Sequence, residues 1–422
     1  MNDAACINTA LTAARPQAIA ALLRYFRDLE VAEEAYQEAC LRALKNWTQN
    51  GPPRDPAAWL ILVGRNAALD AVRRSRRLTP LPADDTLSDL DDAESPLAEQ
   101  LDSAHYRDDL LRLLFVCCHP VLPATQQIAL ALRVVSGLGV RQIARAFLVS
   151  EAAMEQRITR AKAYIAKADL PFETPGAPER ALRLEAVATM IYLLFNEGYS
   201  ATGDAAGERF ALCDEAIRLA RLLLRLFPGE AEIIGLTALL LLQHSRAAAR
   251  LDGDGQIVLM EDQDRSLWDH GLIDEGFALI DEAMRHAQPG PYQVQAAIAA
   301  LHARAPAFGD TDWPQIELLY AALEKLQPSP VVTLNRAVAL SRVQGPAAAL
   351  ALIEPLAGKL SGYFYFHGVK GALLRDLGRF DDARETFNRA IALASTAAEV
   401  AHIRKQMDRL MSESGSHERP CS

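Results

Sequence analysis

Apolar residues recur at spacings of three and four along almost the whole of this 422-residue chain. Such spacing puts them on one face of an α-helix, whereas a strand would need strict alternation. Alanine, leucine, arginine and glutamate, all good helix formers, dominate the composition. Because 50% of the residues are hydrophobic, several cores can form. The sequence therefore predicts an all-α protein of roughly three or four domains.

Charge is distributed unevenly along the chain. The formal net charge of -10 argues against a protein that coats DNA through bulk attraction, since such binding grows with the number of phosphates neutralised. Basic residues nevertheless gather in 65–77 and 141–167, while 84–109 is almost wholly acidic. Two basic patches separated by an acidic segment indicate a protein that binds nucleic acid through these two patches.

No stretch approaches about 20 uncharged apolar residues, and no targeting segment precedes the first helix, so a cytoplasmic protein without a membrane partner is expected. The cysteines lack the spacing of a disulfide framework or zinc ribbon and are expected to be buried thiols. Cys117, Cys118 and His119 are adjacent, but structural zinc uses spaced ligand pairs, so a helix core is expected there. Neither a metal nor a cofactor is predicted. The cysteines are Cys6, Cys40, Cys117, Cys118, Cys213 and Cys421.

Prolines, glycines and acidic runs divide the first half of the chain. Two helices are predicted in 18–47, broken near Leu29, and a third begins at Pro56 and ends in arginines. A proline-containing acidic stretch at 79–102 indicates a linker. Helices are predicted again in 105–167, with a tight break at 136–139.

A second linker at 171–178 precedes a larger helical block, which a tight turn at 252–255 interrupts. A shift of 34 residues, the period of tetratricopeptide helix pairs, aligns apolar and small residues near the end of the chain. The aligned pairs are Ala337 with Gly371, Leu340 with Leu374, Ala349 with Ala383, and Ile353 with Phe387. The predicted domains are 1–78, 105–170, 179–290 and 291–412, with an acidic linker at 79–104 and a disordered tail at 413–422.

A helix-turn-helix is the sharpest local motif. Residues 140–147 suit a short helix, 148–149 the turn, and Ser150 can cap a helix beginning at Glu151 through its hydroxyl alone. Polar groups on the outer side of the second helix can reach base edges and phosphates in a major groove. An ordinary helical hairpin with a solvated basic face is the alternative. The residues expected to be buried are Met154, Ile158, Ala161 and Ile165.

Three segments, in this order, resemble extracytoplasmic-function (ECF) RNA polymerase sigma factors of the sigma-70 family. They are 31–47, similar to the region-two helix that docks on the polymerase clamp, 56–74, similar to the helix that melts and reads the minus-10 element, and 149–162, similar to the region-four recognition helix for the minus-35 element. The resemblance implies that core RNA polymerase and promoter DNA are the partners.

The resemblance assigns candidate contacts to each segment. A carboxylate-rich helix edge suits arginines of a partner, although a merely solvated face is the alternative. The polymerase-binding set is Glu33, Glu34, Gln37 and Glu38. The minus-10 set, which offers phosphate and base contacts, is Arg65, Asn66, Asp70, Arg73 and Arg74. The minus-35 set is Ser150, Glu155, Gln156, Arg157, Thr159, Arg160 and Lys162.

Two features depart from, or depend on, the family pattern. Related recognition helices commonly carry a basic residue at the place of Glu155 and a glycine near the place of Leu148, which suggests an unusual minus-35 preference. The resemblance also implies that the acidic linker threads the RNA channel, although an ordinary spacer fits its composition equally well. The linker acids are Asp84, Asp85, Asp89, Asp91, Asp92 and Glu94.

Residues 192–203 and 259–269 resemble the C-terminal extension of one ECF subgroup. Both are polar and aromatic within an aliphatic block, and the resemblance implies regulation of the sigma domains through a partner protein or ligand. Within them, we expect 196–202 and 261–268 to form one polar surface, with a self-satisfied internal network as the alternative. Its residues are Asn196, Glu197, Tyr199, Asp262, Asp264, Arg265 and Trp268.

No catalytic motif is apparent. Ser200 lacks the second glycine of a nucleophile elbow, and no phosphate loop of the glycine-lysine-serine/threonine type occurs. A non-enzymatic sigma factor is therefore expected. The alternative function is a helix-turn-helix regulator or scaffold with a tetratricopeptide-like domain that acts without polymerase.

Overall fold

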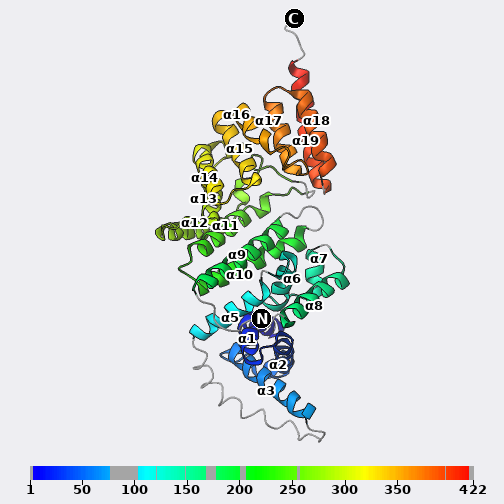
Figure 1. Ribbon diagram of the computed structural model, residues 1–422, viewed down its shortest axis with the longest axis vertical. Helices are drawn as coiled ribbons and strands as arrows, with labels where there is room; N and C mark the ends of the chain where they lie inside the picture. Colours follow the sequence, from blue (N-terminus) through cyan, green and yellow to red (C-terminus); the bar gives the residue numbers. More distant parts are fainter. Residues whose placement is uncertain are drawn as a thin grey trace. The chain divides into compact units, whose positions relative to one another are not determined.

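The computed structural model describes residues 3–76, 103–119, 121–147, 149–167, 177–199, 206–253, 257–394 and 396–417. The chain divides into two compact units, Met1–Leu194 and Phe195–Ser422. Both are built from α-helices, so the predicted all-α class is confirmed (Figure 1). None of the described helices combines the length and the apolar character needed to cross a membrane.

The first unit opens with three helices that pack on one another: α1 (Asp3–Phe26), α2 (Leu29–Asn50) and α3 (Pro56–Arg76). The predicted break near Leu29 is confirmed. Arg27 takes a positive φ of 54°, and the Asp28 carboxylate caps α2 by accepting from the amides of Glu30 and Val31 at 2.8 and 3.2 Å. The buried rings of Trp47 and Trp59 meet edge to face at 5.3 Å and join α2 to α3.

Among the described residues, the helices that follow up to residue 167 are α5 (Ser103–Cys117), α6 (Ala124–Val134), α7 (Val140–Ala146) and α8 (Glu151–Lys167). Both α6 and α7 pack on α8. The helix-core prediction for Cys117 and Cys118 is confirmed, since both thiols are buried and burial raises their pKa values. The prediction of buried thiols is wrong for Cys6, which is exposed at the start of α1.

In the second unit the apolar helix α11 (Ala231–His244) packs against α10 (Ala206–Leu226), α12 (His270–Arg285) and α13 (Pro291–Arg304). Helix α9 (Ala177–Tyr199) crosses the boundary between the units. An antiparallel bridge joins Leu251 to Ile257, on either side of the turn predicted at 252–255; residues 254 and 255 of that turn lie outside the described residues. Short 3-10 helices lie on either side of it, η3 (Ala247–Ala249) and η4 (Arg265–Leu267).

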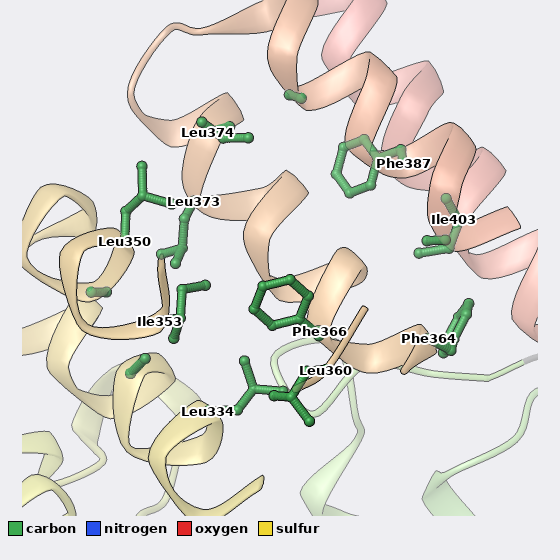
Figure 2. Close-up of a cluster of buried hydrophobic side chains, with 14 of the residues drawn as sticks. Leu334, Leu350, Ile353, Leu360, Phe364, Phe366, Leu373, Leu374, Phe387 and Ile403 are labelled. Carbon is green, nitrogen blue, oxygen red and sulfur yellow. The ribbon is translucent and has the colours of Figure 1, made fainter. Parts of the chain in front are cut away.

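The remaining helices pack each on the next: α14 (Trp313–Leu326), α15 (Pro330–Gln344), α16 (Pro346–Ile353), α17 (Phe364–Asp376), α18 (Phe380–Leu393) and α19 (Ala397–His417). The 34-residue repeat places equivalent residues in equivalent helices of the pairs α15–α16 and α17–α18. Ala337, Ile353 and Phe387 share one buried cluster, part of which Figure 2 shows. A Cβ at Gly371 would lie 2.5 Å from Cε1 of Phe387, so glycine permits the close approach of α17 and α18.

Candidate polymerase and DNA interfaces

Helix α2 presents one polar face to solvent. Three of its four predicted polymerase contacts, Glu34, Gln37 and Glu38, are exposed there. Gln37 and Glu38 lie one helical turn after Glu34. The structure adds two side chains that the apolar pattern of the sequence had not distinguished from core residues. Leu41 is 58% exposed and Leu44 is 51% exposed, and helical spacing puts both on the same face. We call Glu34, Gln37, Glu38, Leu41 and Leu44 the α2 outer face. The sequence does contain a signal for Leu41, because it follows Glu34 by seven residues, or two helical turns, and so shares its face.

Glu33, the fourth predicted polymerase contact, points away from that face. It is 4% exposed and accepts a hydrogen bond from the ammonium group of Lys162 on α8. Its other oxygen lies 3.7 Å from Nη2 of Arg15. Arg15 also donates to the carbonyls of Val134 at 3.0 Å and Arg133 at 3.2 Å, and burial lowers its pKa. Glu33 therefore joins α2 to α8, and Arg15 joins α1 to the end of α6.

Helix α3 carries the predicted minus-10 contacts. The Arg65 guanidinium stands 5.6 Å from the centroid of the Tyr25 ring, and Tyr25 is 51% exposed. Asn66 is half-buried and Asp70 is exposed. Arg73 and Arg74 lie in the last turns of α3, but their side chains fall outside the described residues. The apolar spacing of α1 does not single out Tyr25, and its exposure beside Arg65 adds an aromatic surface suited to an unstacked base.

The helix-turn-helix geometry matches its sequence prediction. The Ser150 hydroxyl accepts from the Ala153 amide at 3.2 Å, and α8 starts at Glu151. All of Met154, Ile158, Ala161 and Ile165 are buried, as expected.

The predicted minus-35 contacts differ in exposure. Arg157 and Lys162 are half-buried, and Lys162 is engaged with Glu33. The exposed ones are Ser150, Glu155, Gln156, Thr159 and Arg160. Leu148 and the acidic residues of the linker lie outside the described residues, as does Ser200.

Comparison with known proteins identifies the family. The Sigma-70 region 2 model matches residues 11–78, and the Sigma-70, region 4 model matches 112–165. The chain belongs to the sigma-70 family. A protein of Rhizobium meliloti (strain 1021), described as uncharacterized, is 69% identical over 413 residues, which is 98% of each chain.

The rest of the comparison concerns the extension of this sigma-70 protein. A family of unknown function (DUF6596) matches residues 183–284, directly after region four. The order of the three matches confirms the resemblance to ECF sigma factors with a C-terminal extension. The matched helix-turn-helix of region four makes the chain a DNA-binding transcription initiation protein.

In this sigma-70 extension, Tyr199 and Trp268, one from each segment of the predicted polar surface, both contact Arg246. Tyr199 accepts a hydrogen bond from Arg246 on its hydroxyl and one from Arg250 on its carbonyl, both at 2.7 Å. Arg265 donates to the carbonyls of His302 and, at 2.7 Å, Ala305. Trp268 is buried between these groups, with guanidinium carbons of Arg246 and Arg265 at 5.8 and 4.6 Å from its ring centroid.

The two aspartates of the predicted surface cap a helix or form an ion pair. Asp264 is exposed and caps η4 through the amide and hydroxyl of Ser266 at 2.9 and 2.6 Å. Asp262 pairs with Arg409 of α19 at 3.4 Å. Asn196 and Glu197 are half-buried near the end of α9. Asp264 and Arg265, although adjacent in sequence, have different partners.

Proposed function

We propose that this protein binds core RNA polymerase through the α2 outer face and directs it to promoters through α3 and α8. The observation that carries the proposal is the exposed combination of carboxylates and leucines on α2, within a matched region two. Exposed leucines beside charged groups are typical of a surface that a partner protein covers. Glutamates at its edge suit a basic partner helix and favour rapid, oriented association.

The test of this function is reconstituted transcription. Core polymerase alone is expected to give no specific transcript from a cognate promoter, and addition of the full-length chain is expected to give one. Substitutions on α2 are then expected to block retention of the chain on polymerase, whereas substitutions on α8 leave that retention intact. Promoter occupancy without polymerase, together with no retention on it, would instead favour an autonomous helix-turn-helix regulator.

Promoter reading by α8 gives a prediction about two arginines. Arg160→Ala is expected to weaken minus-35 binding by about 1–3 kcal/mol, because Arg160 is exposed and can form a bidentate base contact. Arg157→Ala is expected to cost less, since Arg157 is half-buried beside the apolar face. Quantitative footprinting of the holoenzyme at several salt concentrations measures both effects. Equal footprints for Arg160→Ala and the parent would exclude Arg160 from the promoter interface.

We further infer that the extension regulates the sigma regions and that it is not an enzyme. Support comes from its position after regions two and four in one chain, where a family model matches 183–284. Ion pairs also join its segments. Glu261 pairs with Arg342 of α15 and Arg409 of α19, both at 3.5 Å. A change at the 259–269 segment can therefore reach two distant helices of the extension.

A further inference from the structure

A group of arginines in the second unit has no carboxylate partner among the residues that the structure describes. Arg246, Arg250 and Arg265 are half-buried, and none forms an ion pair with a described residue. Asp310 raises the pKa of Arg265 but does not come within ion-pair distance of it. Every other half-buried arginine described in this unit is paired with an aspartate or glutamate. Those arginines are Arg218, Arg221, Arg336, Arg375 and Arg409.

Two aromatic rings bring the unpaired arginines together. The Arg250 guanidinium carbon lies 3.5 Å from the centroid of the Tyr199 ring, whose hydroxyl accepts from Arg246. Arg246 and Arg265 share the ring of Trp268. Burial lowers the pKa values of Arg250 and Arg265, and repulsion from Arg246 lowers them further. Positive charge is therefore concentrated at one place in a chain of net charge -10.

Hydrogen-bond donors at the same place also lack acceptors. Nη2 of Arg265 and Nε1 of Trp268 are shielded from solvent and have no partner among the described residues. Nδ1 of His302, which is a donor or an acceptor according to the ring tautomer, is also shielded and has no partner among the described residues. Burial, together with Arg246 and Arg265, lowers the pKa of His302 to about 4, so its ring is neutral at neutral pH and keeps one N–H. Buried donors normally find a partner, and the described residues supply no acceptor for Nη2 of Arg265 or Nε1 of Trp268.

We propose that Arg246, Arg265 and Trp268 form a binding site for a small anion that carries a phosphate group. A dianion would balance the charges of Arg246 and Arg265, and the planar guanidinium fork matches phosphate oxygens. A tetrahedral anion also offers more acceptor oxygens than a carboxylate, which suits donors from Arg246, Arg265 and the Trp268 indole. Arg250 holds Tyr199, and through it Arg246, in place.

The site would connect segments that are distant in sequence. Tyr199 ends α9, Arg246 precedes η3, Arg265 begins η4, and His302 lies in the last turn of α13. An anion bridging them would order the polar segments of the extension. Its use as a regulatory signal rests on the proposed sigma-factor function, whereas its binding does not.

Binding is tested on the full-length protein by thermal unfolding and titration calorimetry with inorganic phosphate, against sodium chloride of equal ionic strength. We expect a saturable heat and a rise of about 3 °C in Tm with phosphate but not with chloride. Arg246→Gln is expected to lose both responses, and Arg246→Lys to retain a weakened response. Arg221→Gln, which removes an arginine paired with Glu275 in the same unit, serves as the matched control and is expected to keep them.

The possible results distinguish a small phosphate-bearing anion from a general salt effect and from a DNA backbone. Stabilisation by inorganic phosphate or by a nucleotide, abolished in Arg246→Gln, supports the site. The same Tm shift in chloride, or an undiminished response in a folded Arg246→Gln protein, would overturn it. A response to short duplex DNA alone would overturn it too, because the cluster would then contact a DNA backbone. Polymerase is absent from the assay, so these outcomes are independent of the proposed initiation function.

Discussion

The double substitution Glu34→Lys with Glu38→Lys is expected to abolish retention of this chain on core RNA polymerase while leaving its helical content unchanged. Both side chains are exposed on the α2 outer face, so the reversed charges would meet a basic partner without disturbing the buried side of α2. Among the described residues, the ion pair that is lost is Glu38 with Arg42 at 3.0 Å, a surface pair worth about 0.3–0.5 kcal/mol.

Co-purification with core polymerase measures this effect, and circular dichroism verifies the fold. The matched control is Asp274→Lys with Asp281→Lys, which makes the same change in charge on two exposed positions of α12 in the other unit. The control is expected to bind polymerase like the parent. Undiminished retention of the α2 variant would remove the α2 outer face from the polymerase interface.

The second large effect concerns Glu33, the immediate neighbour of Glu34. Glu33→Lys is expected to destabilise the first unit by about 3–5 kcal/mol, because it would bury a lysine against Arg15 and Lys162. Glu34→Lys, one residue further along, is expected to change stability by less than about 0.5 kcal/mol. Hydrogen exchange of the α2 amides during mild denaturation isolates the stability of this unit from that of the extension.

A charge exchange provides the control for this prediction. Combining Glu33→Lys with Lys162→Glu restores an opposite pair between α2 and α8 and is expected to recover part of the lost protection. Protection equal to that of the parent in Glu33→Lys alone would show that the pair does not stabilise the unit. While the Glu33–Lys162 salt bridge is formed, Glu33 cannot contact polymerase and Lys162 cannot contact a DNA phosphate. The contacts predicted for these two residues therefore require the salt bridge to break.

The local spacing of apolar residues in the sequence determined where the helices lie and which of their faces are buried in several parts of this protein. The three- and four-residue spacing predicted helices, and the helix-turn-helix positions Met154 and Ile158 are buried as that spacing requires. The 34-residue repeat aligned Ile353 with Phe387, and both residues lie in one buried cluster. These features follow from the sequence because a helical period assigns residues to a face without reference to the rest of the chain.

The tertiary structure decided what covers each face. Glu33 and Glu34 are adjacent glutamates with one predicted role, yet only Glu33 is buried, because Arg15 and Lys162 reach it from α1 and α8. Leu41 fits an apolar pattern but stays exposed because no described helix packs over it. The arginine cluster of the extension draws on segments more than 50 residues apart in sequence, so no window along the chain contains it. Periodicity tells which residues share a helix face, whereas partners that pack from distant segments determine whether that face is core, interface or ligand site.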